Sequence, residues 1–157
     1  YILVAFHPIE GEDQKEVEKA INEFSQSFEI VNIASNNDYG KKFGTENYSP
    51  DEYINLLRYA SICVGNSSSF LKETSVLGVP VVNIGSRQNK RLKPHNVIDV
   101  PCEASRIKSA IDFQLKNKYK PDPIYFQEKT SNKIASKLKE ILYDQRSHLF
   151  HSRPERQ

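Results

Sequence analysis

The feature that most constrains the fold is the run SICVGNSSSFLKETSVLGVPVVNIGSRQNKR, which extends from Ser61 to Arg91. Its apolar start stops at Gly65, and three serines follow. Residues 70–77 then have helical character, and Pro80 opens a second apolar run. This order predicts a strand, a loop, a helix and a second strand.

The same alternation of strands and helices continues along the whole chain. Further strands are expected at residues 1–6, 28–34 and 97–100. Further helices are expected from the Glu12–Asp13 turn to about Gln26, from the Ser49 cap and Pro50 to Ala60, over 103–116 and from about 127 to 143. The alternation predicts an α/β fold with a Rossmann-like parallel sheet flanked by helices on both faces.

Polar loops follow the expected strands at one edge of this sheet. They are His7, residues 35–40, residues 65–69 and residues 85–93. Ligands of open parallel sheets bind outside the carboxyl ends of the strands. We therefore expect these four loops to meet at one binding rim.

The serine loop has two readings. Gly65 permits a tight turn, and Ser67 to Ser69 would lie at a helix start, where free N–H groups and the helix dipole favour a phosphate. Alternatively, Ser67 or Ser68 is simply the N-cap of the helix and needs no ligand. Three consecutive hydroxyls exceed what one cap requires, which favours the anion site slightly.

Four other positions are candidate site residues, each with a structural alternative. His7 is suited to hydrogen-bond phosphate or to act as an acid or base, or else to cap local backbone. Asn36, like Asp38, either contacts a ligand or shapes its own loop. Glu73 either accepts hydrogen bonds from ribose or is a solvated helix residue. Arg87 is the expected direct contact within a basic loop that is otherwise solvated.

Composition excludes several classes of function. A net charge of +2 in 157 residues gives no global field typical of nucleic-acid binding. No segment is long and apolar enough to span a bilayer and no signal peptide is evident, so we expect a cytoplasmic protein. Cys63 and Cys102 are expected to be ordinary thiols rather than a disulfide or zinc site. We expect no metal and no cofactor.

The long central pattern resembles a known family. Residues 65–69, Gly-Asn-Ser-Ser-Ser, followed by Lys72-Glu73 and by residues 78–88, GVPVVNIGSRQ, closely resemble the hydrolysing UDP-N-acetylglucosamine 2-epimerases. The likeness is to the sialic and legionaminic acid pathway branch, and to the carboxyl-terminal half. Phe6-His7-Pro8 and residues 36–38 resemble less specific parts of the same pattern.

The resemblance implies a glycosyltransferase-B-like fold of two lobes, with residues 1–157 as the nucleotide-binding carboxyl-terminal lobe. Residues 148–157 are polar and are expected to form a flexible tail. It implies that Ser67 and Ser68 hold the UDP diphosphate, with Glu73 at the ribose, Arg87 near the uracil end and Asn36 at the nucleotide. His7 would lie near the diphosphate or the sugar, as a catalytic residue. The family eliminates UDP from a UDP-sugar and hydrates the glycal, releasing an N-acetylmannosamine-type sugar.

Two departures from the family pattern qualify this reading. Phe70 replaces a glycine that commonly follows the serines, so its ring is expected either to reshape the helix start or to approach the uridine. The carboxylates for proton transfer belong to the amino-terminal lobe, which is absent here, so the isolated fragment is expected to be inactive. Apolar surface facing that lobe would favour a homo-oligomer. The alternatives are a glycosyltransferase donor-binding domain and a non-catalytic UDP-sugar-binding module.

Overall fold

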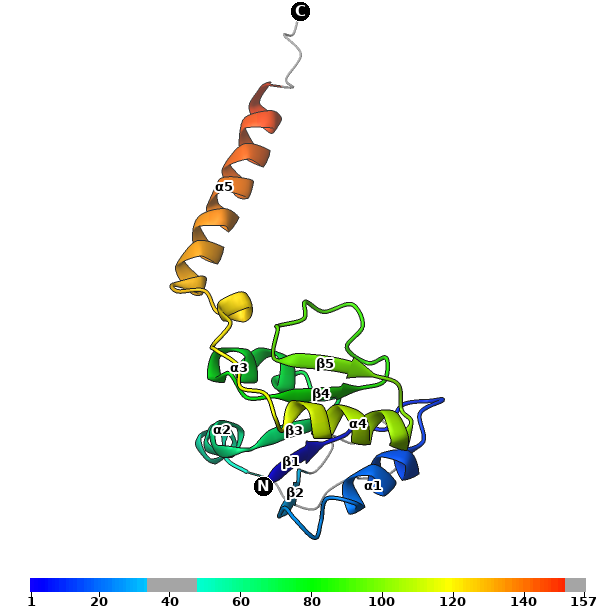
Figure 1. Cartoon of the computed structure of the whole chain (residues 1–157). Helices are drawn as coiled ribbons and strands as arrows, with labels where there is room; N and C mark the ends of the chain where they lie inside the picture. The colour runs from blue at the N-terminus through cyan, green and yellow to red at the C-terminus, as the bar shows by residue number, and fades with distance from the viewer. Residues whose placement is uncertain (34–47, 152–157) are drawn as a thin grey trace, which may run out of the picture. The chain divides into compact units, whose positions relative to one another are not determined.

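A computed structural model describes residues 1–33 and 48–151, and it divides into two units, Tyr1–Tyr125 and Phe126–Gln157. The first unit contains a five-stranded sheet in the order β2-β1-β3-β4-β5, in which every neighbouring pair is parallel. The strands are β1 (Ile2–Ala5), β2 (Ile30–Asn32), β3 (Ile62–Gly65), β4 (Val81–Ile84) and β5 (Val97–Val100). The expected α/β, Rossmann-like fold is confirmed (Figure 1).

Four helices cover the two faces of this sheet. They are α1 (Gln14–Asn22), α2 (Pro50–Tyr59), α3 (Ser69–Leu77) and α4 (Ala104–Gln114). Side chains of alternate strand residues point to opposite faces. In β1, Ile2 and Val4 pack with residues of α1 and α4, whereas Leu3 packs with residues of α2 and α3. The sheet is therefore the buried middle layer of three.

Local signals in the sequence explain where these helices begin and end. The Asp13 side chain accepts a hydrogen bond from Lys15 N at 2.9 Å and starts α1. Ser49 and Glu52 form a reciprocal capping box, with Pro50 in the first turn of α2. Gly78 ends α3 in the left-handed conformation, with φ 68°. The helix boundaries expected from the sequence are thus confirmed to within a few residues.

The second unit contains one long helix, α5 (Thr130–His151), which extends past the end expected at Tyr143. The stretch expected to be a tail from residue 148 is therefore helical at its start. Its apolar stripe has the expected composition but is not buried: the exposed fractions are 56% for Ile134, 54% for Leu138, 45% for Ile141 and 60% for Leu142.

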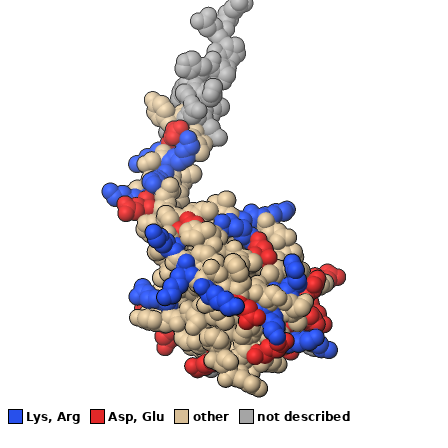
Figure 2. All heavy atoms as spheres, viewed as in Figure 1, with Lys and Arg blue, Asp and Glu red and all other residues tan. Residues whose placement is uncertain are grey.

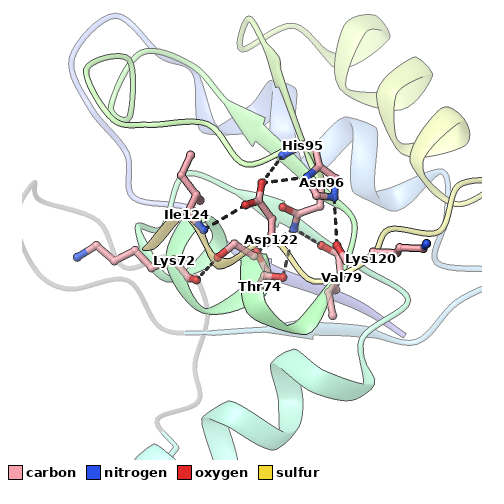
Figure 3. Close-up of polar contacts among 9 residues, drawn as sticks. Lys72, Thr74, Val79, His95, Asn96, Lys120, Asp122 and Ile124 are labelled. Atoms are coloured by element: carbon pink, nitrogen blue, oxygen red, sulfur yellow. Dashed lines mark hydrogen bonds and ion pairs between the residues drawn. The ribbon is translucent and has the colours of Figure 1, made fainter. Parts of the chain in front are cut away.

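Side-chain hydrogen bonds close the amino end of the sheet (Figure 3). Asn96 Nδ2, just before β5, donates to Val79 O at 2.6 Å and to Thr74 O at 3.3 Å. Next to it, His95 Nδ1 lies 2.9 Å from Asp122 Oδ2, and His95 Nε2 lies 3.1 Å from Lys120 O. These contacts fix the end of α3 and the chain after α4 to the start of β5.

Charge is mixed on the face of the molecule that Figure 2 shows. Figure 2 shows Lys and Arg side chains interspersed with Asp and Glu on the visible face. Within the described residues, no helix is both long enough and apolar enough to cross a membrane.

Candidate functional site

The site begins at Gly65, the last residue of β3. Its φ is 144°, and a Cβ built there would lie 2.1 Å from Ala5 O of the neighbouring strand. No side chain fits at that distance. Glycine is therefore required here by close backbone approach, which lets β1 and β3 remain paired up to the edge of the sheet.

Asn66 is the residue that joins the loops at this edge. It is fully buried, its Oδ1 accepts from His7 N at 2.7 Å, and its Nδ2 donates to His7 O at 2.9 Å. Its own carbonyl accepts from Arg87 Nη1 at 3.0 Å and from Gln88 Nε2 at 2.7 Å. One asparagine thus holds together the ends of β1, β3 and β4.

The three serines lie at the amino end of α3, as expected. Ser68 occupies the N-cap position, but its side chain makes no capping hydrogen bond. Among the described residues, the backbone N–H groups of Ser67, Ser68 and Ser69 have no acceptor. The helix start therefore presents unused donors at its positive end, and a side-chain N-cap does not account for Ser68.

The hydroxyl groups of the loop are linked to α2. Ser67 Oγ and Ser69 Oγ are 2.9 Å apart, and Ser69 Oγ also bonds to the Tyr53 hydroxyl. Burial raises the pKa of Tyr53, while its bond to Ser69 opposes that rise. Tyr53 remains neutral at neutral pH, and its hydroxyl connects the serine loop to α2.

Arg87 reaches the site from the loop after β4. Its side chain is exposed apart from the bond to Asn66, and that bond leaves its other guanidinium donors without partners among the described residues. Gln88 beside it is only 2% exposed. The arginine is thus anchored close to the serine loop, with donors available for an anion.

Glu73 lies in the second turn of α3 and is half-buried. Burial raises the pKa of its carboxyl above the ordinary value, although its own backbone N–H and Lys72 act in the opposite direction. Within the described residues, Glu73 Oε2 is buried without a hydrogen-bond partner. Glu73 is therefore partly buried and is not a freely solvated helix residue.

The structure brings together most of the expected residues. His7 and Arg87 are hydrogen-bonded to Asn66, and Ser67 and Ser68 are the two residues that follow Asn66 in the chain. Asn36 lies outside the described residues. His7 is half-buried, and its backbone is held by the Asn66 side chain.

Phe70 does not approach a ligand, contrary to one of the two expectations for it. Its exposed fraction is 0%, and it packs in the core with Leu57 and Val79. The ring anchors the start of α3 to the sheet instead of lining the rim.

Sequence reasoning missed three residues that shape the site, namely Asn66, Tyr53 and Glu12. Asn66 directly follows the glycine that ends β3, which was the available signal. Tyr53 and Glu12 carry no such signal, because their partners Ser69 and Ser86 lie 16 and 74 residues away.

The donors of the site are backbone N–H groups and the Arg87 guanidinium, which bind anions and not metal ions. No group of three or more His, Cys, Asp or Glu side chains among residues 1–33 and 48–151 is arranged to hold a metal ion. Of the two cysteines, Cys63 is fully buried in β3, where burial raises its pKa. Burial also raises the pKa of Cys102, to about 11.

Comparison with known proteins identifies similar chains. Polysialic acid biosynthesis protein P7 of Escherichia coli is 31% identical over 140 residues, which cover 76% of this chain and 36% of that protein. The UDP-N,N'-diacetylbacillosamine 2-epimerase (hydrolyzing) of Legionella pneumophila is 38% identical over 57% of this chain and 24% of its own length. The UDP-N-acetylglucosamine 2-epimerase of Neisseria meningitidis is 29% identical over 71% of this chain and 34% of its own.

These relatives are much longer than this chain, which spans about a third or less of their length. The family described as UDP-N-acetylglucosamine 2-epimerase matches residues 1–139. This match covers most of the chain, including every strand and the whole rim described above. The chain therefore belongs to the UDP-N-acetylglucosamine 2-epimerase family.

Proposed function

We propose that this chain is the UDP-binding, carboxyl-terminal lobe of a hydrolysing UDP-sugar 2-epimerase. The substrate class is UDP-N-acetylglucosamine or a UDP-diacetamido sugar, as in the names of the relatives from Neisseria and Legionella. The lobe binds and orients the nucleotide, and the whole protein carries out the reaction.

One observation carries this proposal: unused donors converge at the start of α3. The N–H groups of Ser67 to Ser69 lack acceptors among the described residues, and the Arg87 guanidinium is anchored to the preceding residue, Asn66. A diphosphate supplies acceptor oxygens and negative charge for these groups. Their placement at the carboxyl edge of a parallel sheet is where nucleotides bind in such folds.

The remaining residues take roles that fit their surroundings. Glu73 accepts hydrogen bonds from the ribose hydroxyls, which supply the partner that its buried oxygen lacks. His7 contacts the diphosphate or the sugar from the end of β1. Asn36 contributes from the loop after β2.

In the whole protein, a carboxylate outside this chain removes the proton at sugar C2, and the bond between C1 and the UDP oxygen breaks. UDP leaves with the bonding electrons, and a 2-acetamidoglucal remains. Addition of water, with a proton to C2 and hydroxyl to C1, then gives the free epimeric sugar. Arg87 and the α3 N–H groups favour departure because they stabilise the negative charge that develops on UDP.

Calorimetric titration of this chain with UDP tests the binding role. Changing Ser67 and Ser68 together to alanine is expected to weaken UDP binding by about 1–3 kcal/mol, the cost of losing hydrogen bonds to a charged group. Ser109→Ala is the matched control, because its hydroxyl bonds to Ser105 O on the exposed side of α4. Unchanged affinity in the double variant contradicts hydrogen bonds from these two hydroxyl groups to the diphosphate, and failure of the unmodified chain to bind UDP contradicts the phosphate site itself.

A further inference from the structure

Glu12 makes a contact that the proposed function does not use. It lies in the loop between β1 and α1, and its Oε1 accepts hydrogen bonds from Ser86 N at 2.7 Å and Ser86 Oγ at 3.0 Å. This contact joins parts of the chain that are 74 residues apart. It connects the loop after β1 directly to the loop after β4.

The chain is shaped to admit this carboxylate. Gly85, the residue before Ser86, has φ 73°, and a Cβ built on it would lie 2.1 Å from Glu12 Oε1. Any other residue at position 85 would displace the Glu12 side chain. The Gly85 N–H is itself fixed to Val100 O at 2.8 Å. The direction in which the chain leaves β4 is thus set from two sides.

The residue that follows this contact is Arg87. The loop is held before Arg87 by Glu12 at Ser86 and after it by Gln88, whose Nε2 donates to Asn66 O at 2.7 Å. The arginine itself is exposed, and within the described residues its side chain makes one hydrogen bond, from Nη1 to Asn66 O. Its position therefore depends on its neighbours more than on its own packing.

We propose that Glu12 is a positioning residue, which holds the loop after β4 so that the Arg87 guanidinium faces the diphosphate. Glu12 itself does not contact the nucleotide. The inference rests on the proposed function, since it requires that Arg87 contacts the same diphosphate that the serine loop binds.

A purely structural cross-link is the competing explanation, and the chain contains a matched example. Glu16 Oε2 accepts from Ala104 N at 2.8 Å, so it also joins the region of α1 to a distant backbone N–H. Glu103, the N-cap residue of α4, provides no side-chain cap, and Glu16 serves that purpose. Glu16 has the same chemistry as Glu12 without a connection to Arg87.

The test is a double-mutant cycle measured by UDP titration of the chain, with melting temperature followed in parallel. Arg87→Ala and Glu12→Ala are each expected to weaken UDP binding by about tenfold. Adding Glu12→Ala to Arg87→Ala is expected to change the affinity by less than about twofold, because Glu12 affects binding only through the position of Arg87. Glu16→Ala is expected to lower the melting temperature and leave the UDP affinity unchanged.

Two conservative variants at position 12 distinguish the effect of side-chain length from the effect of negative charge. Glu12→Gln keeps the side-chain length and one acceptor oxygen, so it is expected to retain most of the affinity. Glu12→Asp keeps the charge but is one methylene too short to reach Ser86, so it is expected to behave like alanine. This pair also decides the question if Glu12→Ala does not fold.

The outcomes distinguish the two proposals. Equal losses from Glu12→Ala with and without Arg87 overturn the positioning role, as does full affinity in Glu12→Asp. If the unmodified chain does not bind UDP, the proposed function fails and the inference fails with it. If the serine variant weakens binding but Arg87→Ala does not, the phosphate site stands and the role of Glu12 is overturned.

Discussion

Similar polar residues lie at the two ends of the central sheet, but their hydrogen bonding differs. At the amino end, the side-chain amides of Asn96 and Gln114 donate hydrogen bonds to backbone carbonyls of the neighbouring strands and helix. At the carboxyl end, Asn66 joins the loops, but the N–H groups of the serine loop and the oxygens Glu12 Oε2 and Gln88 Oε1 have no partners among the described residues.

This difference indicates that polar groups at the amino end stabilise the fold, whereas groups at the carboxyl end are candidates for binding a ligand. Asn96 Oδ1 is an exception, because it is also buried without a partner within the described ranges. Elsewhere at the amino end the polar groups serve to hold the fold together. At the carboxyl end, the unused N–H groups lie at the start of α3, where a bound ligand is expected to accept hydrogen bonds from them.

The largest effect is expected from Gly65→Ala, which breaks the carboxyl end directly. The new Cβ would lie 2.1 Å from Ala5 O, so the strands must separate, at a cost of about 3 kcal/mol or more. Denaturant unfolding measures this loss, and UDP titration is expected to show no binding. Gly11→Ala is the control: Gly11 has a φ of 83° but no atom near the added Cβ, so it is expected to cost about 1 kcal/mol. Similar losses in both variants would show that backbone conformation dominates, not close approach.

A pair of asparagine variants sharpens the comparison. Asn66→Ala and Asn96→Ala each remove side-chain hydrogen bonds and leave buried backbone groups unpaired, at an expected cost of about 2–3 kcal/mol in unfolding free energy. Only Asn66→Ala is expected to weaken UDP binding, because the serine loop and Arg87 meet at that residue. The pair is compared by denaturant unfolding and by titration at a temperature where both remain folded. A loss of UDP affinity in Asn96→Ala would contradict the division between the two ends.

The smallest effects come from two carboxylates with opposite pKa shifts. The raised pKa of Glu73 means that the folded state binds its proton more tightly. Its ionisation therefore costs stability as pH rises above the ordinary value of 4.5. Glu73→Gln is expected to raise the melting temperature at pH 7, with the difference disappearing at low pH, while it weakens UDP binding a few-fold.

Asp122 at the amino end is the matched control for Glu73. Desolvation raises the pKa of Asp122, but the hydrogen bonds that it accepts from His95 and Ile124 together outweigh this effect and lower the pKa below its ordinary 3.8. Its contribution to stability is present above that value and is lost as pH falls through the lowered pKa. Asp122→Asn is therefore expected to lower the melting temperature slightly at pH 7 and leave UDP affinity unchanged. A lower melting temperature for Glu73→Gln at pH 7 would show that its carboxylate is structural.

Much of the fold could be predicted from the sequence because its signals are local. The cap at Ser49, Pro50 and Glu52 lies within one turn, and Gly78 ends a helix by its own conformation. The serine loop and its position at a strand end were also predictable, since both follow from the break at Gly65. The exposure of the α5 stripe was not predictable, because periodicity shows that a face is apolar but not what covers it.

The connections within the site could not be predicted for a different reason. The contact of Asn66 with His7 spans 59 residues, and that of Glu12 with Ser86 spans 74. The position of Asn66 after Gly65 marks it as a loop residue at a strand end, but nothing in the local sequence indicates the partner of either Asn66 or Glu12. Their roles depend on the order of strands in the sheet, which brings β1, β3 and β4 side by side.

If the proposed nucleotide site is correct, the junction at Asn66 would also couple folding to ligand binding. Its contacts exist only when three strands are in register, so an unfolded or partly folded chain has no equivalent pocket for an anion. A nucleotide bound there would select the native state alone, and by mass action its concentration would set the heat resistance of the chain. The dependence of the melting temperature on nucleotide concentration would thus report whether the three strands are correctly aligned.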